Sequence, residues 1–413
     1  MAVIVDPHMD RGALPDLRPR SRAVKIADAT VRANYRTWRH LWSTVCGERQ
    51  RQFHRKAMGL VDANARHTAH AAVDEMVLVF FEAMSDSMTP DQFITLEREV
   101  DELIEHWHRT AIFETPLALH QSPPAPVRTV LVEEELGGRR GEWLHFDSGW
   151  RPPEGAPGAE RWMAAPLNEN VPVALLRHDD GPRPWLVLVH GAEMGRPRFD
   201  SRLLKAHQLH QSLGVNIAMP TLPLHGLRRS DGPTVRGTFP GENVIENVWG
   251  LTQSVWDVRR TIAWIRQQDP SAIGLFGFSL GGGVGSLIGS LDPDLDALVL
   301  GCPAVDLVEL IARNQPPRLS GNARLGELLR RAALAHRPVS ALNLDRVIHR
   351  DRVALVSAPA DRLADPIDQV GRLWHHWAQP EIRWIDGGHV TYFMRRQSTE
   401  TLEDLLRARG VAA

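Results

Sequence analysis

The sequence predicts an α/β fold, with a mostly parallel sheet flanked by helices and a helical segment in front of it. Two observations predict the sheet. From residue 126 onward, short apolar runs alternate with longer segments of helical character, which is typical of strands joined by crossover helices. Some runs, such as Trp185–Gly191, are almost continuously apolar, as expected of strands covered on both faces.

The composition is that of an ordinary globular protein, with 43% hydrophobic and 24% charged residues in a chain of 413. The formal net charge of −2 provides no general basic field, so no nucleic acid partner is expected. Cys46 and Cys302 are too few for a disulfide framework. Asp6 and Asp10 stand where a signal peptide needs a basic head and an apolar run, and no apolar stretch is long enough to span a membrane. We therefore expect a cytoplasmic protein.

Residues 1–125 are expected to form an N-terminal helical segment. Three helices are expected in it, over residues 24–42, 71–81 and 90–108, from apolar residues at three- and four-residue steps and from a proline at a first helical turn. Thr89 is the expected N-cap of the third helix. The tryptophans of this segment are expected to pack in a core: Trp38, Trp42 and Trp107. A proline cluster at 121–127 ends the segment.

Residues 126–413 are expected to form one α/β domain. Its strands are expected over 127–136, 142–146, 171–176, 185–191, 215–220, 272–278, 297–301, 352–358 and 381–386. Helices are expected between the later strands, over 199–213, 244–267, 282–291 and 322–336. The segment 302–351 is longer than a simple crossover requires, so an insertion is expected there.

A turn of sequence GFSLG, from Gly277 to Gly281, follows one of the apolar strands and leads into a helix of small residues. It matches the G-x-S-x-G pattern of a nucleophile elbow, which exposes a serine on a strained strand-to-helix turn. Glycine is needed at both ends because a side chain there would collide with the adjacent strand or helix. The helix that begins at Leu280 directs free N–H groups toward the reaction centre of Ser279.

From this turn, and from His190-Gly191-Ala192 at the end of an earlier strand, the chain resembles the α/β-hydrolase superfamily over residues 170–400. The resemblance implies an α/β-hydrolase fold. It also implies an oxyanion hole made by the backbone N–H groups of Ala192 and Leu280, which would stabilise charge that develops in the transition state.

The same resemblance implies the remaining members of a catalytic triad. Asp361 follows the eighth expected strand, where the family places its acid, and His389 follows the ninth, where it places its base. The order of Ser279, Asp361 and His389 is that of the superfamily. Asp306 and Asp365 remain alternatives for the acid; Asp365 directly precedes a proline, which is typical of a helix N-cap.

These residue types together suit acyl transfer. A serine hydroxyl attacks a carbonyl when a base takes its proton, a neutral histidine is such a base, and an aspartate orients the histidine. The expected function is therefore hydrolysis of a small-molecule carboxylic ester or thioester through an acyl-enzyme on Ser279. Two alternatives are an acyltransferase with the same triad and a non-catalytic binding protein of hydrolase fold. No metal and no organic cofactor is expected.

Further details follow from the resemblance. Hydrolases of this fold often insert a cap over the serine, which implies a lid at 302–351. Met219–Gly232, Leu373–Trp377 and Gly387–Val390 are similar to a branch that includes α/β-hydrolase domain-containing protein eighteen. Homo-oligomerisation is left open by the sequence.

Overall fold

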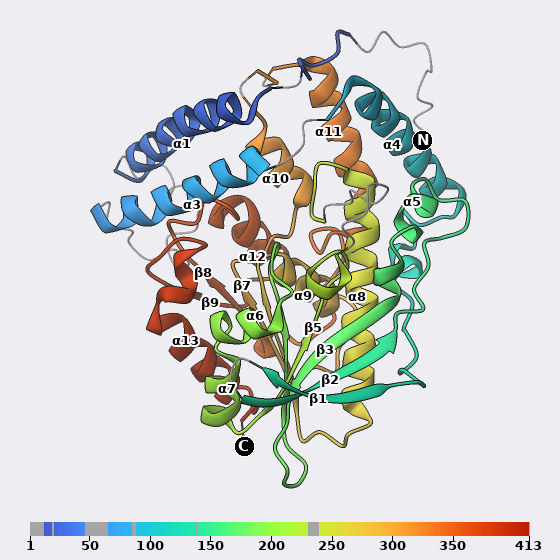
Figure 1. Ribbon diagram of the computed structural model, residues 1–413, viewed down its shortest axis with the longest axis vertical. Helices are drawn as coiled ribbons and strands as arrows, with labels where there is room; N and C mark the ends of the chain where they lie inside the picture. The colour runs from blue at the N-terminus through green and yellow to red at the C-terminus, as the bar shows by residue number, and fades with distance from the viewer. Residues whose placement is uncertain are drawn as a thin grey trace.

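The computed structural model describes residues 12–18, 20–45, 65–84, 88–136, 139–229, 239–316, 318–319 and 321–412. The expectations about Asp6, Asp10 and Cys46 concern residues outside these ranges. The described chain forms one nine-stranded sheet in the order β1-β2-β3-β5-β4-β6-β7-β8-β9 (Figure 1). The strands are β1 Val130–Leu136, β2 Arg139–Asp147, β3 Asn170–Leu176, β4 Trp185–Val189, β5 Asn216–Pro220, β6 Ile273–Phe278, β7 Ala297–Gly301, β8 Val353–Ser357 and β9 Glu381–Trp384.

The sheet is mixed but mostly parallel. Strands β1, β2 and β3 pair antiparallel, β3 pairs antiparallel with β5, and every pairing from β5 through β9 is parallel. All nine expected strands are present, with ends within a few residues of those expected. The predicted fold class is confirmed.

Helices cover both faces of the sheet, which explains the continuous apolar runs. Alternate residues of β4 point to opposite sides: Trp185 and Val187 join one buried cluster, whereas Leu186 and Leu188 join the other. The helices of the α/β part are α5 Ala159–Met163, α6 Pro197–Leu203, α7 Ala206–Leu213, α8 Val244–Arg266, α9 Leu280–Gly289, α10 Leu307–Asn314, α11 Ala323–Ala335, α12 Arg372–His376 and α13 Arg396–Arg407. Helices α8, α9, α11 and α12 pack on the first cluster, and α7 and α13 on the second.

The prediction of a single helix over residues 199–213 is wrong. The structure has two helices, α6 and α7, because Lys205 adopts a left-handed conformation with φ of 55°. Lys205 is the N-cap of α7, and its left-handed backbone changes the direction of the chain between the two helices. Nothing in the composition of this stretch marks the break, since it contains neither glycine nor proline after Pro197.

The N-terminal helices are α1 Arg22–Val45, α3 Ala65–Met84 and α4 Pro90–Arg109. Thr89 caps α4 as predicted, in a reciprocal capping box with Gln92. Trp107 is fully buried against Trp249 and donates a hydrogen bond to the carbonyl of Ala335 at 2.9 Å. Helix α4 is thereby part of the same core as the sheet.

The prediction that Trp38 and Trp42 pack in a core is wrong, because α1 lies with its apolar face outward. These two side chains are 68% and 62% exposed. The polar face points inward instead: Arg32 and His40 are buried, and Arg32 pairs with Glu82 of α3. Periodicity correctly predicted a helix, but the face of α1 that packs inward carries Arg32 and His40 rather than the aromatic side chains.

No helix in the described part of the chain is both long and apolar enough to cross a membrane.

Candidate active site

Ser279 occupies a strained turn between β6 and α9. Its φ of 55° and ψ of −116° lie outside the regions that non-glycine residues favour. A Cβ on Gly277 would lie 2.1 Å from the carbonyl oxygen of Gly281, and one on Gly281 would lie 2.2 Å from that of Val189. These distances provide the steric reason for glycine at both ends of the turn.

Replacing Gly277 with alanine is expected to lower the free energy of unfolding by about 3 kcal/mol, because the added methyl group meets backbone that cannot move aside. The matched control is Gly326→Ala in α11, where an added Cβ has no neighbour within 4 Å and should stabilise the helix by up to about 1 kcal/mol. Urea denaturation followed by circular dichroism measures both. Equal midpoints for the two variants would show that the turn is not sterically closed.

Three side chains lie in a hydrogen-bonded series at the carboxyl ends of β6, β8 and β9. The Nε2 atom of His389 is 2.9 Å from the Oγ of Ser279, and its Nδ1 atom is 2.7 Å from the Oδ2 of Asp361. The other oxygen of Asp361 accepts hydrogen bonds from the N–H groups of Leu363 and Ala364. Because the carboxylate is fixed and accepts from Nδ1–H, the Nε2 lone pair of a neutral His389 faces the hydroxyl group.

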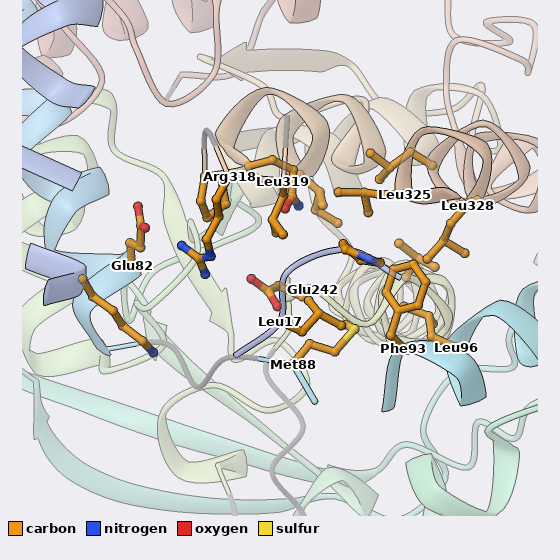
Figure 2. Close-up of a pocket in the computed structure, with 18 residues that line it drawn as sticks. Leu17, Glu82, Met88, Phe93, Leu96, Glu242, Arg318, Leu319, Leu325 and Leu328 are labelled. Carbon is orange, nitrogen blue, oxygen red and sulfur yellow. The ribbon is translucent and has the colours of Figure 1, made fainter. Parts of the chain in front are cut away.

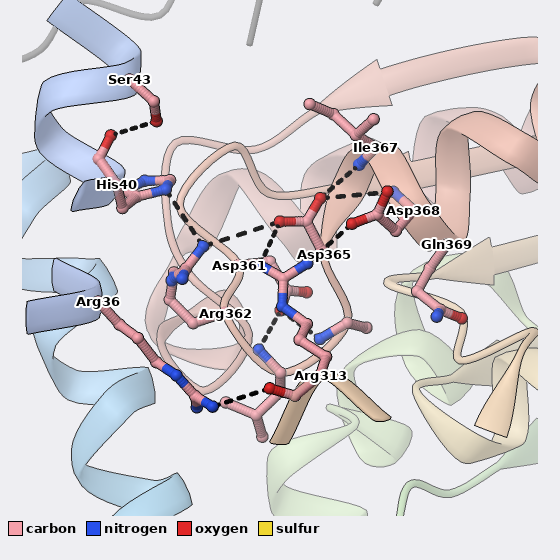
Figure 3. A network of polar contacts seen from close by, with 12 residues as sticks. Arg36, His40, Ser43, Arg313, Asp361, Arg362, Asp365, Ile367, Asp368 and Gln369 are labelled. Carbon is pink, nitrogen blue, oxygen red and sulfur yellow. Dashed lines mark hydrogen bonds and ion pairs between the residues drawn. The ribbon is translucent and has the colours of Figure 1, made fainter. Parts of the chain in front are cut away.

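The alternative acids have other partners. Asp306 caps α10 by accepting from the N–H of Glu309 and pairs with Arg372. Asp365 caps the turn Pro366–Gly371, as predicted, and pairs with Arg313 (Figure 3). Of the three aspartates, Asp361 is the one whose carboxylate contacts the imidazole of His389.

The electrostatic setting favours a charged imidazole at His389. Burial lowers the pKa of His389, but the charge and hydrogen bond of Asp361 and the charge of Asp74 outweigh burial, so the pKa lies above its usual value. An imidazolium at this position is therefore stabilised by two carboxylates.

The peptide between Gly191 and Ala192 is held by His190. Burial lowers the pKa of His190 to about 3, so the ring is neutral. Its Nε2 accepts from the N–H of Leu222 at 3.0 Å, and its Nδ1–H therefore donates to the carbonyl of Gly191 at 2.8 Å. In a trans peptide the C=O and the next N–H point in opposite directions, so the N–H of Ala192 is turned away from the imidazole.

The residues next to the two expected oxyanion donors, or the donors themselves, adjoin the serine. Gly191, which precedes Ala192, lies against Ser279, since a Cβ on Gly191 would be 3.2 Å from the Cβ of the serine. Leu280 follows Ser279 directly and is the first residue of α9, so its N–H has no acceptor within the helix.

Cys302, Asp361 and His389 lie close enough together that one atom from each falls within 4.8 Å of the others. By residue type such a trio suits a metal ion. However, the Nδ1 of His389 and the Oδ2 of Asp361 already contact each other, and the Nε2 of His389 contacts the Oγ of Ser279. Burial and the nearby charge of Asp361 raise the pKa of the Cys302 thiol. The cluster fits a hydrogen-bonded series of serine, histidine and aspartate better than a metal site.

Two buried residues of this region were missed by sequence reasoning: Asp74 of α3 and Arg362, the neighbour of Asp361. Arg362 contacts the Nδ1 of His40 at 3.3 Å (Figure 3). It also pairs with Glu75 at 3.0 Å, so it ties the loop after β8 that carries Asp361, the acid loop, to α1 and α3. The adjacent acids Asp74 and Glu75 interrupt the apolar run 71–81, and this interruption was the available signal.

An apolar pocket lies elsewhere, between the N-terminal segment and helices α8, α10 and α11 (Figure 2). Leucines and Phe93 form one end, and charged side chains, including Glu242 and Arg318, stand at the other. Neither Ser279 nor His389 lines it, so this pocket is separate from the serine–histidine pair.

A mostly parallel sheet with a strained serine turn after β6 and a histidine after β9 defines a protein of the α/β-hydrolase fold. Solved structures agree on the fold. Acetyl xylan esterase 1 from Thermoanaerobacterium sp. JW/SL YS485 superposes with a TM-score of 0.50 at 16% identity, over 74% of this chain and 93% of its own. The acetyl xylan esterase from Paenibacillus sp. R4 has a TM-score of 0.50 at 17% identity, over 79% of this chain and 100% of its own.

The chain belongs to the family of two Mycobacterium tuberculosis proteins, uncharacterized protein Rv2627c of strain ATCC 25618 / H37Rv and uncharacterized protein MT2702 of strain CDC 1551 / Oshkosh. Each is 39% identical over 345 residues, which cover 83% of this chain and 82% of the relative. No family model matches the chain.

Proposed function

We propose that this protein is a serine hydrolase that cleaves a carboxylic ester or thioester through an acyl-enzyme on Ser279. The observation that carries the proposal is the continuous series from the Ser279 hydroxyl through His389 to Asp361, with separations of 2.9 and 2.7 Å. Geometry of this kind is how a catalytic triad is recognised, independently of fold.

The proposed reaction proceeds in two acyl-transfer steps. His389 accepts the hydroxyl proton as Ser279 attacks the ester carbonyl, and it then donates that proton to the departing alcohol. Asp361 keeps Nδ1 protonated and stabilises the imidazolium. The N–H groups of Ala192 and Leu280 receive the negative oxygen of each tetrahedral intermediate. A water molecule, activated by His389, releases the acid and restores Ser279.

The similar structures support this class of reaction, since both are named acetyl xylan esterases. Within the superfamily, we assign the chain to the branch that includes α/β-hydrolase domain-containing protein eighteen, on the three sequence segments quoted above. We also propose that the protein is cytoplasmic and acts on a small-molecule acyl ester.

We further propose residues 126–413 as the catalytic domain, 1–125 as an accessory helical segment and 302–351 as a cap. Helices α10 and α11 fall within the proposed cap. Helix α11 is joined to α4 by partly buried ion pairs, from Arg324 to Glu97 and from Arg331 to Asp101. The cap and the accessory segment would thus cover the domain together.

The test is intact-mass spectrometry after incubation with a small fluorophosphonate, followed by peptide mapping. The proposal expects a single adduct on Ser279 that is lost in His389→Ala. A smaller sulfonyl fluoride run in parallel removes the ambiguity of a closed cap. Failure of folded protein to react with either reagent would contradict the proposal and favour a binding protein. Product ratios with added alcohols or amines separate hydrolysis from acyl transfer to those nucleophiles.

The rate of hydrolysis is expected to fall on acidification at a pH above the ordinary histidine value of 6.5. The reason is that a protonated His389 cannot accept the serine proton, and the charges of Asp361 and Asp74 raise its pKa despite burial. As pH falls through this raised pKa, the neutral fraction and therefore kcat/KM decline. A kcat/KM profile that keeps its full value down to pH 5 would contradict this assignment of the base.

A further inference from the structure

We propose that Asp74, on α3 of the N-terminal segment, is a positioning residue that aligns the triad. It joins the acid loop after β8, which carries Asp361 and Arg362, to the base loop after β9, which carries His389 and Val390. The inference rests on the proposed function of Ser279, Asp361 and His389, and it gives the N-terminal segment a role in the reaction. Asp74 contacts no reacting atom in the scheme above, so its effect would be exerted through His389.

The carboxylate of Asp74 is placed between the two loops. Its Oδ2 atom accepts hydrogen bonds from the backbone N–H of His389 at 2.7 Å and of Arg362 at 3.0 Å. Its Oδ1 atom accepts from the N–H of Val390 at 3.0 Å. The three donors are thus the base itself, the residue after it and the residue after the acid Asp361.

Packing leaves little freedom at this junction. Asp74 has no exposed surface, and a Cβ on Gly388 would lie 2.7 Å from its Oδ2. The glycine before His389 therefore allows the base loop to approach the carboxylate. A shift of about 1 Å at such a junction would lengthen the contact between His389 and Ser279 beyond hydrogen-bond reach, and shifts of that size can cost about a hundredfold in rate.

The site of Asp74 disfavours the charged form of a carboxylate. Burial and the nearby charge of Asp361 raise the pKa of Asp74 to about 6, whereas His389 and the backbone N–H groups lower it. Two buried carboxylates beside one imidazole are unfavourable in the resting protein, but they stabilise the imidazolium that forms when Ser279 attacks. Asp74 therefore contributes charge as well as alignment.

Neighbouring groups hold α3 in place. Glu75 follows Asp74 on the helix and pairs with the guanidinium of Arg362, and Arg36 of α1 lies 3.9 Å from Glu75. The charged or titratable groups facing His389 and Asp74 across this junction are Asp361, Cys302, Arg362, Glu75 and His40. A pH profile must therefore be interpreted against a wild-type profile measured in parallel.

Asp74→Asn tests the proposal with little change of shape. The amide loses the charge and cannot accept from all three N–H groups. We expect kcat for a p-nitrophenyl ester to fall by about tenfold to a hundredfold with KM changed less than about twofold, because the substrate is bound but the triad is misaligned. The acid limb of kcat/KM should also move to lower pH, since His389 loses a stabilising charge.

The matched control is Glu97→Gln, which neutralises another buried carboxylate of the N-terminal segment. Glu97 pairs with Arg324 and Arg331 of α11, and neither arginine lies in the loops that carry Asp361 and His389. It should keep the wild-type pH limb. The proposal would be overturned if both variants lost kcat equally and the acid limb of the kcat/KM profile of Asp74→Asn did not shift. Asp74 would then have a structural role only.

Gly388→Ala provides a second route if Asp74→Asn does not fold. Its methyl group pushes the base loop away from Asp74 without altering α3, so it should lower kcat and shift the acid limb in the same direction. Wild-type kcat and an unshifted limb in Gly388→Ala would also overturn the proposal.

A readout that needs no turnover separates this inference from the proposed function. The pKa of His389 is measured by NMR on protein with 13C-labelled histidine, with the signal assigned by its loss in His389→Gln. A lower pKa in Asp74→Asn supports the coupling, and an unchanged pKa contradicts it. If the pKa falls but wild-type Ser279 reacts with no fluorophosphonate, the proposed hydrolase function fails while the contact between Asp74 and His389 stands, and the role in alignment is withdrawn.

Discussion

Replacing Ser279 with alanine is expected to lower kcat for ester hydrolysis by about a millionfold, because it removes the hydroxyl on which the proposed acyl-enzyme forms. The fold should be unaffected. Ser279 is only half-buried, and its side chain has the Nε2 of His389 as its partner, which water can replace. Turnover of p-nitrophenyl acetate measures the first effect, and the thermal midpoint by circular dichroism measures the second.

Ser286→Ala is the matched control for this variant. Ser286 lies in the same helix, α9, is fully buried and donates to the carbonyl of Gly283. Its loss should leave kcat within about threefold of wild type, since the local bond is a single neutral hydrogen bond. Retention of more than a few per cent of wild-type kcat in Ser279→Ala would assign the nucleophile to another residue.

Replacing Asp361 with asparagine is expected to lower kcat by about 10⁴-fold. The asparagine oxygen can still accept from Leu363 and Ala364, so the loop keeps its shape. Its amide nitrogen then faces the Nδ1 of His389, and two N–H donors cannot pair. The ring must take the other tautomer, with Nε2 protonated, and it can no longer accept the proton of Ser279.

Asp306→Asn separates this explanation from the alternative acid. Asp306 caps α10, a task that asparagine performs about as well, and its pair with Arg372 is partly exposed and worth at most about 1 kcal/mol. We therefore expect kcat within about twofold of wild type. A larger loss in Asp306→Asn than in Asp361→Asn, measured in the same assay, would transfer the role of the acid to Asp306.

The sheet and the serine turn were predictable because local pattern and tertiary position agree there. A strand such as β6 is buried on both faces, so every residue from Ile273 to Phe278 is constrained in the same way and the apolar run is unbroken. The turn at Gly277 and Gly281 is equally explicit, since each glycine is required by a backbone contact close to 2 Å. These constraints act on residues that are adjacent in the sequence, so the sequence pattern reveals them.

The N-terminal segment was less predictable because its docking depends on pairs that are distant in sequence. The spacing of Tyr35, Trp38 and Trp42 predicts a helix and an apolar face, but only the partners of Arg32 and His40 determine that the opposite face turns inward. Asp74 was missed for the same reason. Its three donors lie 288, 315 and 316 positions further along the chain, so the acidic pair at 74–75 marks a polar position but does not identify its partners.

Because α1 is attached through charged groups and leaves its aromatic face in water, the energetics of its attachment differ from those of the core. Apolar burial holds the sheet and its covering helices together, whereas α1 is held by pairs of charged groups such as Arg32–Glu82 and Arg36–Glu75. Segments with few buried apolar contacts open by partial unfolding at lower free energy than the rest. Heat would therefore release α1 before the sheet and its covering helices, and opening that carried α3 along would remove the Asp74 carboxylate from the loops that it is proposed to join.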